Sequence, residues 1–494
     1  MSQVRRTRIV CTIGPSSSSP HVLRAMVQAG MDVARFNFSH GDAETHRQAA
    51  AAVREAAETA GRPVALLGDL QGPKIRTGEL DGAAFKRLVR GRLVGLIAAP
   101  PALRATSRQV GRTDLPTNGE DSARENPDDI TVSHVELVQA LRPGDRVLLD
   151  DGRIELAVRS VSDGRAEASV MRGGLLGERK GVSVPGRPLP LPALTEKDLE
   201  DLRLAMELDV DYLALSFVRR AEDIVICQQH ITGHNKTVPV IAKLEKLEAI
   251  RNLDAILEVA DAVMVARGDL GVELKLGDLP AVQKDVIDRA NRAGVPVITA
   301  TEMLESMVTS NRPTRAEASD VANAIWDGTD AVMLSQETSV GAHPVEAVRA
   351  MARICLAAQK HPTYERARQI WREPGQVGSA IAHAAASTAA ELHARVIIAF
   401  TESGTTALRC SKARPPMPII AASPHPEVLR RTALYSGVVP LQVSPGRDTD
   451  QMISNATEAA VESGMVRPGD RVVVVAGVPV GRPGQTNLLK VETV

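Results

Sequence analysis

The residues best suited to chemistry in this sequence stand at the ends of apolar runs. In "AVMVARGDLGVE" (262–273), an apolar run leads directly into a charged segment that contains Asp269. In "VPVIAKLE" (238–245), a similar run ends in Lys243 and Glu245. Residues two apart on a strand point to the same side, so this lysine and glutamate would project together. The two stretches predict one cation and two carboxylates at neighbouring strand ends.

Two carboxylates on adjacent strands suit a hard divalent cation, with substrate oxygens and water as the remaining ligands. We therefore predict that Glu245 and Asp269 bind Mg²⁺, with Mn²⁺ as an alternative ion, and that Lys243 lies beside it. A simpler interpretation stays open, in which "KLEKLE" (243–248) is an ordinary charged helix start with solvated side chains.

Gly268 separates the two charges of an Arg-Gly-Asp tripeptide (267–269). Cell adhesion by this motif needs an exposed loop on a secreted protein, and the apolar run before it argues against both. Glycine instead permits close backbone approach, and the helix turn expected from "DLGVE" (269–273) has free N–H groups that can hold a carboxylate or phosphate. A plain tight turn is the alternative.

Polar residues follow the other apolar runs as well. Arg35 ends one run, and because an unpaired buried arginine is costly, we expect it to bind an anionic ligand. His40, close by, could simply cap a loop. The other members of this group are Asn37 and Ser39, Asp69 with Lys74 and Arg76, Thr301 with Glu302, and Ser335 with Glu337.

Eight phrases repeat the same order of an apolar run, polar residues with glycine, and a helical stretch. Continuous apolar strands that alternate with amphipathic helices indicate parallel strands covered by helices. Eight of them predict a closed (β/α)8 TIM barrel, in which the polar residues meet at the carboxyl ends of the strands. The runs lie within 8–16, 32–41, 63–74, 211–220, 238–245, 261–271, 295–304 and 330–339.

The third and fourth runs are separated by far more than one helix. Within that gap, residues 143–174 alternate like strands joined by Asp-Gly turns, which predicts an all-β domain inserted where a lid would lie. Residues 83–129 have little strand pattern. After a helix expected at 344–359, residues 361–376 resemble a linker, and a small open α/β sheet follows.

The expected domains are a catalytic barrel (1–72 and 186–358), a β-rich lid (73–185) and a C-terminal α/β domain (359–494). In the last domain, "FTESGTTALRC" (400–410) passes from a strand through a hydroxyl-rich loop into a helix. Ser403, Thr405, Thr406 and the N–H groups of this loop could hold a phosphate. A mere strand–helix turn is the alternative.

The composition excludes several classes of function. With 59 basic and 60 acidic residues, the net charge is −1, so neither nucleic acid nor a membrane is an expected partner. No apolar run reaches the roughly 18 residues of a membrane-spanning helix. The four cysteines are far apart and predict unpaired thiols in a reducing cytoplasm.

Long, ordered motifs run through nearly the whole chain, among them "CTIGPSS", "ARFNFSHG", "DLQGPKIRTG", "KGVSVPG", "SFVR", "VARGDLGVE", "TATEMLESM" and "NRPTRAEASDVANAIWDGTDAVMLS". With these motifs, the chain closely resembles the pyruvate kinase family. The resemblance implies phosphoryl transfer between phosphoenolpyruvate and ADP, giving pyruvate and ATP, by a homotetramer. The family's architecture agrees with the barrel, lid and C-terminal sheet.

The resemblance also implies roles for the strand-end residues. Lys243 would stabilise charge on the transferring phosphoryl group, as a loose and strongly anionic transition state demands. Glu245 and Asp269 would hold Mg²⁺ between phosphate and enolate oxygen, and Thr301 would lie near the face where the enolate is protonated. The other implied contacts are Arg35 with the phosphoryl group, Gly268, Asp269 and Thr301 with the carboxylate, and Asn37, His40 and Arg76 with the nucleotide.

Lys74 departs from the family pattern, because many members have an acidic residue at this position. The resemblance implies a K⁺ ion beside Asn37, Ser39 and Asp69. The ammonium group of Lys74 could replace the charge of that ion, so we expect K⁺ to be dispensable. Two further departures affect fine pocket geometry, at Glu302 and Gln336.

The family often places a sugar-phosphate activator at the loop of the C-terminal domain, so we expect a sugar phosphate or nucleotide effector there, covered by residues 477–491. Two rival functions stay open. A Mg²⁺-dependent barrel enzyme acting on pyruvate enolates, such as an aldolase, would share Glu245 and Asp269 but needs no inserted lid. A catalytically silent family member acting as a metabolite sensor would be expected to lack Lys243 or Thr301, and both are present.

Overall fold

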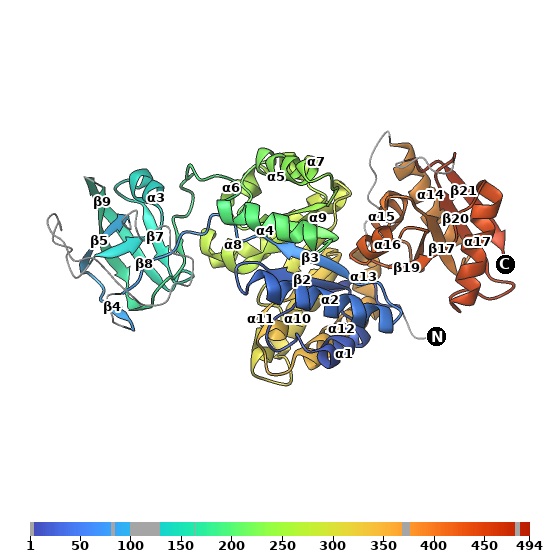
Figure 1. The fold of residues 1–494 in the computed structure, drawn as a ribbon, viewed down its shortest axis with the longest axis horizontal. Helices are drawn as coiled ribbons and strands as arrows, with labels where there is room; N and C mark the ends of the chain where they lie inside the picture. The colour runs from blue at the N-terminus through green and yellow to red at the C-terminus, as the bar shows by residue number, and fades with distance from the viewer. Residues whose placement is uncertain (1–3, 81–83, 99–128, 163, 368–375, 480–484) are drawn as a thin grey trace.

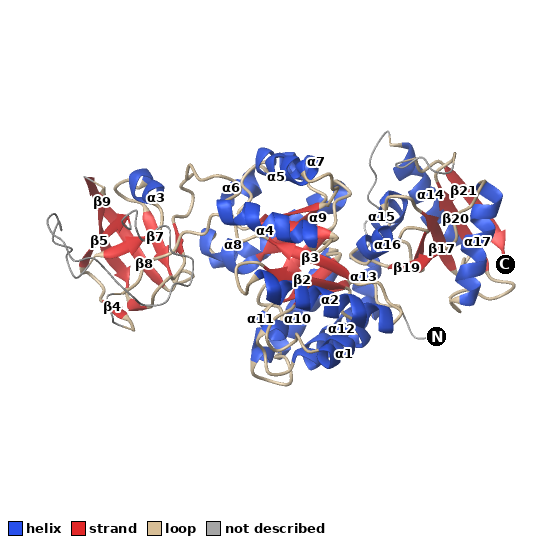
Figure 2. Cartoon of the chain, in the orientation of Figure 1, coloured by secondary structure: helices blue, strands red, loops and turns tan. Residues whose placement is uncertain are grey.

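The structure is a computed structural model that describes residues 4–80, 84–98, 129–162, 164–367, 376–479 and 485–494. Three bodies lie in a row, with a barrel between the inserted domain and the C-terminal domain (Figure 1). Helices surround the strands of the middle body, whereas the insert is built mostly of strands (Figure 2). Within the described residues, no helix is long and apolar enough to cross a membrane.

The middle body is a closed barrel of parallel strands in the order β1-β16-β15-β14-β13-β12-β3-β2. All eight predicted strands are present, and the prediction of a TIM barrel is confirmed. Their bounds are β1 Arg8–Thr12, β2 Val33–Asn37, β3 Ala65–Asp69, β12 Tyr212–Leu215, β13 Val240–Leu244, β14 Ala262–Ala266, β15 Val297–Ala300 and β16 Ala331–Leu334.

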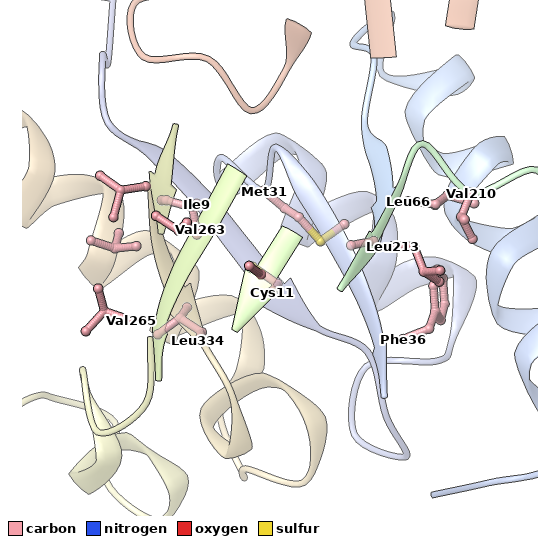
Figure 3. Packing of buried hydrophobic residues seen from close by; sticks show 14 of the residues in the cluster. Ile9, Cys11, Met31, Phe36, Leu66, Val210, Leu213, Val263, Val265 and Leu334 are labelled. Carbon is pink, nitrogen blue, oxygen red and sulfur yellow. The ribbon is translucent and has the colours of Figure 1, made fainter. Parts of the chain in front are cut away.

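Alternate residues of each strand pack on the two sides of the barrel wall, as the period of a strand requires. In β14, Val263 and Val265 pack outward against the helices, in the same core as Phe36 (Figure 3). Met264 packs inside the barrel with Val10. Because both faces are buried, these strands are continuously apolar, which is why they were recognisable in the sequence.

Local signals fix the outer helices. Thr195 and Thr314 each begin a helix with a capping box, and Gly328 ends the second of these helices with a φ of 101°. The segment after β13 forms two short helices that meet at Asn252. The helices are α1 Pro20–Ala29, α2 Ala43–Thr59, α4 Glu196–Glu207, α5 Ala221–Gly233, α6 Leu247–Arg251, α7 Leu253–Val259, α8 Arg267–Glu273, α9 Leu279–Arg292, α10 Arg315–Asp327, α11 Gln336–Ser339 and α12 Pro344–Lys360.

The insert is a six-stranded sheet in the order β11-β7-β8-β9-β5-β6 with a two-stranded β10-β4 pair. Two of its strands fall in 83–129, where the sequence had little strand pattern, while 99–128 lie outside the described residues. A short helix, α3 Val135–Ala140, adds to the expected all-β content. The strands are β4 Lys86–Leu88, β5 Leu93–Ala98, β6 Ile130–Val132, β7 Arg146–Leu149, β8 Ile154–Ser162, β9 Arg165–Arg172, β10 Gly174–Leu176 and β11 Val182–Ser183.

The C-terminal body is an open sheet in the order β19-β18-β17-β20-β21, as predicted. Its last strand runs antiparallel at the edge and was not expected. Part of the predicted linker is helical, as α13 Pro362–Ala367, and 368–375 lie outside the described residues. The elements are α14 Val377–Glu391, β17 Val396–Phe400, α15 Thr405–Lys412, β18 Ile419–Ser423, α16 Pro426–Thr432, β19 Val438–Gln442, α17 Thr449–Glu462, β20 Arg471–Ala476 and β21 Leu488–Thr493.

The C-terminal body packs on the amino ends of the barrel strands, opposite the insert (Figure 1). From the amino ends of the strands, Leu434 and Tyr435 pack against the core inside the barrel. Lys412 and Arg414 form buried ion pairs with Asp330, which precedes β16, at 2.7 and 2.9 Å. The insert therefore approaches one end of the barrel and the C-terminal domain is fixed to the other.

Candidate active site

A cavity at the carboxyl ends of the barrel strands is shared by the barrel and the insert. Glu245 and Asp269 both line it, together with Lys74. Gly152 and Ser183 line it from the insert. The structure thus brings the two predicted metal ligands, which stand on different strands, to one space beneath the predicted lid.

Lys243 lies at the centre of a buried polar cluster. Its Nζ is 2.9 Å from Glu245 Oε1 and 3.3 Å from Asp69 Oδ1, and it donates a hydrogen bond of 2.7 Å to Ser216 Oγ. Burial would lower the pKa of Lys243, but Asp69 and Glu245 raise it above its usual value. The side chains of Lys243 and Glu245 are only 12% and 1% exposed, so the interpretation of a solvated helix start is wrong.

Arg35 and Asp69 form a second buried pair at the same end. Arg35 donates to Asp69 Oδ2 at 2.6 Å and to Thr12 Oγ1 at 2.8 Å. Burial would raise the pKa of Asp69, but Lys243 and Arg35 lower it below the usual value. Because Asp69 already compensates Arg35, its burial does not by itself require an anionic ligand, and that part of the sequence argument is weakened.

Glu245 and Asp269 affect each other electrostatically across the cavity. Burial and then the neighbouring Asp269 raise the pKa of Glu245, although Lys243 opposes the rise. Phe217 donates its backbone N–H to Glu245 Oε2 at 2.7 Å, and Lys74 Nζ lies 3.4 Å from Asp269 Oδ1. Two carboxylates that repel each other in one cavity fit a divalent cation, which would relieve the repulsion.

Within the described residues, no group of three or more His, Cys, Asp or Glu side chains could enclose a metal ion. A magnesium ion here would therefore take its remaining ligands from substrate and water, as the sequence predicted. This suits a catalytic Mg²⁺, which usually keeps several waters and binds through one or two carboxylates and substrate oxygens.

The Arg-Gly-Asp segment is the first turn of α8 and not an exposed loop. The Arg267 side chain is only 8% exposed, donates to Thr301 O at 2.7 Å and pairs with Asp320 at 2.6 Å. The adhesion interpretation and the plain tight turn are both wrong, and helical structure begins two residues before the expected Asp269. The Gly268 N–H donates to Thr301 Oγ1 at 2.7 Å, so it is engaged within the chain.

The residues that end β15 have unusual backbone geometry. Thr301 and Glu302 have φ values of 67° and 54°. Few non-glycine residues adopt this left-handed region, and such strain gathers at functional sites. Thr301 is brought beside Gly268, whereas Glu302 is exposed. Glu337 is buried and accepts N–H bonds from Leu304 and Ser335, and burial raises the pKa of its carboxyl group.

Positive charge surrounds the loop after β2. Burial, then Arg76, Arg35 and Lys74, lower the pKa of His40, which keeps its imidazole neutral near pH 7. Asn37 accepts an N–H bond from Ser39 at 3.2 Å and is paired in register with Asp69. The structure therefore gathers Asn37, Ser39, Asp69 and the residues predicted for the nucleotide on adjoining strand ends.

The hydroxyl-rich loop of the C-terminal domain lies far from this cavity. Ser403 and Thr405 share a hydrogen bond of 2.9 Å, and Thr406 contacts Thr486 Oγ1 at 3.0 Å. Thr486 belongs to the tail that was expected to cover the loop, so the two segments do meet. Part of that tail, 480–484, lies outside the described residues.

Two residues of the site, Ser216 and Phe217, were not predicted from the sequence. Ser216 accepts the hydrogen bond from Lys243 and itself donates to Leu70 O at 2.7 Å. Phe217, with a φ of 55°, carries the amide that holds Glu245. Their signal was present, because "SFVR" ends the fourth apolar run, but no charge drew attention to it.

Comparison with known proteins agrees with this geometry. The family described as "Pyruvate kinase, barrel domain" matches residues 4–348, and "Pyruvate kinase, alpha/beta domain" matches residues 379–492. The chain belongs to the pyruvate kinase family. The activity of this enzyme is therefore the glycolytic transfer of a phosphoryl group from phosphoenolpyruvate to ADP, and the aldolase alternative is excluded.

Individual relatives match along nearly the whole chain. The pyruvate kinase of Mycobacterium tuberculosis is 44% identical over 99% of this chain and 98% of its own length. Pyruvate kinase of Geobacillus stearothermophilus is 43% identical over 99% of this chain and 80% of its own length. Pyruvate kinase 2 of a Synechocystis species is 45% identical over 99% of this chain and 79% of its own length.

Proposed function

We propose that this pyruvate kinase works as a Mg²⁺-dependent enzyme whose chemistry is carried by Lys243, Glu245, Asp269, Arg35 and Thr301. The observation that carries the proposal is the contact of Lys243 with Glu245, which lines a cavity together with Asp269. A fixed ammonium beside two carboxylates is what a strongly anionic transition state requires once the carboxylates hold a cation.

Glu245 and Asp269 would hold the Mg²⁺, or Mn²⁺ in its place. When bound, the ion neutralises charge on the phosphate and on the enolate oxygen. The Phe217 amide fixes the Glu245 carboxylate, so this ligand is oriented before the ion arrives. Burial raises the pKa of Glu245 and Asp269 adds to the rise, so a cation held by both carboxylates would favour the charged form.

Lys243 positions its ammonium group against the transferring phosphoryl group. Ser216 and Asp69 restrict the direction of that group, and the acidic neighbours keep it protonated. Arg35, held by Asp69, binds the phosphoryl oxygens. Both cations share one buried counter-ion, so little reorganisation is needed when the substrate binds.

The substrate carboxylate would be received by the first turn of α8, at Gly268 and Asp269, with Thr301. Thr301 Oγ1 must exchange its present bond with the Gly268 N–H for one to the substrate. Thr301 lies on the side from which the enolate is protonated, through water. Asn37, His40 and Arg76 would contact the nucleotide, whose phosphates suit the surrounding cations.

Pyruvate formation from phosphoenolpyruvate tests the reaction, with and without ADP and with Mg²⁺ present or chelated. We expect pyruvate and an equal amount of ATP only when both are present. ADP-independent release of pyruvate, or turnover unaffected by a chelator, would contradict the proposal. The absence of turnover under all conditions would favour the metabolite sensor.

Lys74 is proposed to make K⁺ dispensable in the pocket of Asn37, Ser39 and Asp69. Its ammonium group lies beside Asp269 and within electrostatic reach of His40, so it adds positive charge to the same region. The assay is turnover in buffer free of K⁺ and Na⁺, which we expect to be near full. Lys74→Glu should become dependent on K⁺; loss of most wild-type turnover without K⁺ would refute the role.

A phosphate-bearing effector, a sugar phosphate or a nucleotide, is proposed for the loop that carries Ser403, Thr405 and Thr406. The contact of Thr406 with Thr486 of the tail supports this location. Candidate effectors should shift the phosphoenolpyruvate saturation curve, and an unchanged curve with all of them would refute the proposal.

We also propose that the protein is a cytoplasmic homotetramer. Each chain would be divided as predicted, into barrel 1–72 and 186–358, lid 73–185 and regulatory domain 359–494. Four buried unpaired cysteines agree with a reducing compartment.

A further inference from the structure

Glu273, the last residue of α8, lies where the barrel and the insert meet. Its side chain is only 2% exposed and pairs with Lys246. The mechanism above gives it no role. A buried carboxylate needs compensation, so its partners show what it is holding together.

One oxygen of Glu273 accepts two short hydrogen bonds from different parts of the molecule. Lys246 Nζ lies 2.6 Å from Oε1, and Ser183 Oγ donates to the same oxygen at 2.7 Å. Lys246 follows β13 in the barrel, and Ser183 ends β11 in the insert. Glu273 therefore joins α8, the loop after β13 and the insert at one point.

Both members of the Lys246–Glu273 pair lie close in the chain to a proposed metal ligand. Lys246 directly follows Glu245 in the chain, and Glu273 lies four residues after Asp269, on the same face of α8. The Lys246–Glu273 pair thus sets the distance between the two segments that carry the metal ligands. All four of these residues line the same cavity.

The bond from Ser183 adds the insert to this arrangement. Movement of the insert away from the barrel breaks the Ser183 bond and leaves the buried Glu273 oxygen with Lys246 alone. Charge-assisted hydrogen bonds of this length are among the strong ones in proteins. Loss of the Ser183 bond therefore changes how the remaining Lys246–Glu273 pair is held.

We propose that Glu273 is a positioning residue that couples closure of the insert to the geometry of the Glu245–Asp269 metal site. The coupling rests on the proposed function, since it requires a metal at those carboxylates. It gives lid closure a direct consequence at the metal ligands, in addition to the exclusion of water that closure provides.

The test compares Glu273→Gln, Lys246→Met and Ser183→Ala with two controls. Lys284→Met removes an exposed lysine that pairs with Asp327 outside the site, and Ser160→Ala removes an exposed serine of the insert. The readouts are Mn²⁺ affinity without substrate, KM and kcat for both substrates, and hydrogen exchange of the insert.

Partners that orient metal ligands typically contribute about 10–100-fold to metal affinity. We expect Glu273→Gln and Lys246→Met to weaken Mn²⁺ binding at least about tenfold. Ser183→Ala should leave Mn²⁺ affinity of the free enzyme within about twofold, raise KM and speed exchange in the insert, because only the link to the insert is lost.

The Ser183→Ala/Lys246→Met double variant sharpens the test, because both groups act through one oxygen. Their effects on KM should fall short of the sum of the single effects. The coupling is overturned if wild type binds Mn²⁺ and all three single variants match their controls, or if the double variant is strictly additive. Lys246→Met and Ser183→Ala decide the matter should Glu273→Gln fail to fold.

A wild-type enzyme that binds no Mn²⁺ at all would instead remove the proposed metal site, and the coupling with it. Glu245→Gln identifies the site in the same titration, since it should abolish Mn²⁺ binding. The failure of the coupling and the failure of the metal site therefore give different results.

Discussion

The two ends of the barrel both bury carboxylates among cations, yet they use them differently. At the amino ends, Asp330 accepts the N–H of Val297 at 2.9 Å and pairs with Lys412 at 2.7 Å and Arg414 at 2.9 Å, so its charge is compensated within the chain. At the carboxyl ends, Glu245 and Asp269 face a cavity and repel each other. Both ends of the barrel therefore bury charged side chains. Only the carboxyl end leaves negative charge that a bound cation would neutralise.

The arrangement at the amino ends is repeated around the barrel. An aspartate precedes every second strand and accepts the backbone N–H at the start of the strand before it, at 2.8 to 2.9 Å. The pairs are Asp32 with Ile9, Asp211 with Leu66, Asp261 with Val240, and Asp330 with Val297. Each of these aspartates satisfies a backbone N–H group near the start of a strand, which is a structural task.

The difference teaches that a buried ionisable cluster is not evidence of a site until its position on the fold is known. The amino-end aspartates fix the strands and the C-terminal domain. The carboxyl-end residues follow the strands, where barrel enzymes place their chemistry. Four predictions test this division between the two ends of the barrel.

The largest effect is expected at the carboxyl end, from Lys243→Met. Loss of one preorganised charge at a transferring group typically costs about 10²–10³-fold in kcat, and we expect at least that loss. The protein should remain folded, since Asp69 keeps Arg35 as its partner. Steady-state kinetics against Lys284→Met as control provide the measurement, and near-full turnover would show that the role assigned to Lys243 is wrong.

At the amino end, Asp330→Asn should affect stability and leave catalysis nearly unchanged. It leaves the Lys412 side chain, which is 1% exposed, without its counter-charge, and breaking a buried pair in this way costs about 3–5 kcal/mol. Urea unfolding measures the loss. The exposed Asp285→Asn serves as control and should cost less than about 1 kcal/mol.

A fall in kcat as large as that of Lys243→Met, at unchanged stability, would contradict the division between the two ends.

A smaller effect is expected at Phe217, whose φ of 55° is unfavourable for any residue with a Cβ. In urea unfolding, the free energy of unfolding of Phe217→Gly should exceed that of Phe217→Ala by about 1 kcal/mol, although glycine is ordinarily the more destabilising residue. The exposed Asn235, also at a φ of 55°, gives the matched pair of Gly and Ala variants.

Only the Phe217 variants should also change Mn²⁺ affinity, because a different residue there alters the position of the backbone N–H that donates to Glu245. If alanine proves the more stable at Phe217, the strain at this end of the barrel is not real.

The smallest effect concerns pH at the amino end. Burial would raise the pKa of Asp330, but Arg414 and Lys412 lower it below the usual 3.8. A carboxylate with a lowered pKa stabilises the fold fully above its unfolded value, and this contribution is lost as pH falls through the folded value. The stability difference between wild type and Asp330→Asn should thus not shrink between pH 7 and about 4, and should shrink only at lower pH. A difference that shrinks already between pH 7 and 5 would show that the carboxylate is not held in its charged form.

Much of the fold was predictable, because the strands are buried on both faces and so are continuously apolar. "AVMVA" before Arg267 illustrates this, as all five residues are buried. The β-strands at 86–98 were missed, because they lie in the insert, where residues such as Leu93 are exposed and the apolar residues show little periodicity. The break at Asn252 and the edge strand at 488–493 depend on tertiary contacts that no local pattern encodes.

The site was predictable where charge follows an apolar run. Lys243, Glu245 and Asp269 were recognised in this way, whereas Ser216 and Phe217 were not, because a hydroxyl and a strained backbone amide look ordinary in sequence. Arg35 was recognised for an incomplete reason, since its partner Asp69 stands on another strand.

The eight strands, their polar ends and the family could be predicted without coordinates, because they depend on local composition and on motifs. The folded arrangement was needed to see which charges are neutralised within the chain and which remain available to a ligand. That distinction depends on distances between side chains that are far apart in sequence, such as Lys412 to Asp330 and Ser183 to Glu273. Coulomb energies and hydrogen bonds act over a few ångströms in space, and the chain order does not record them.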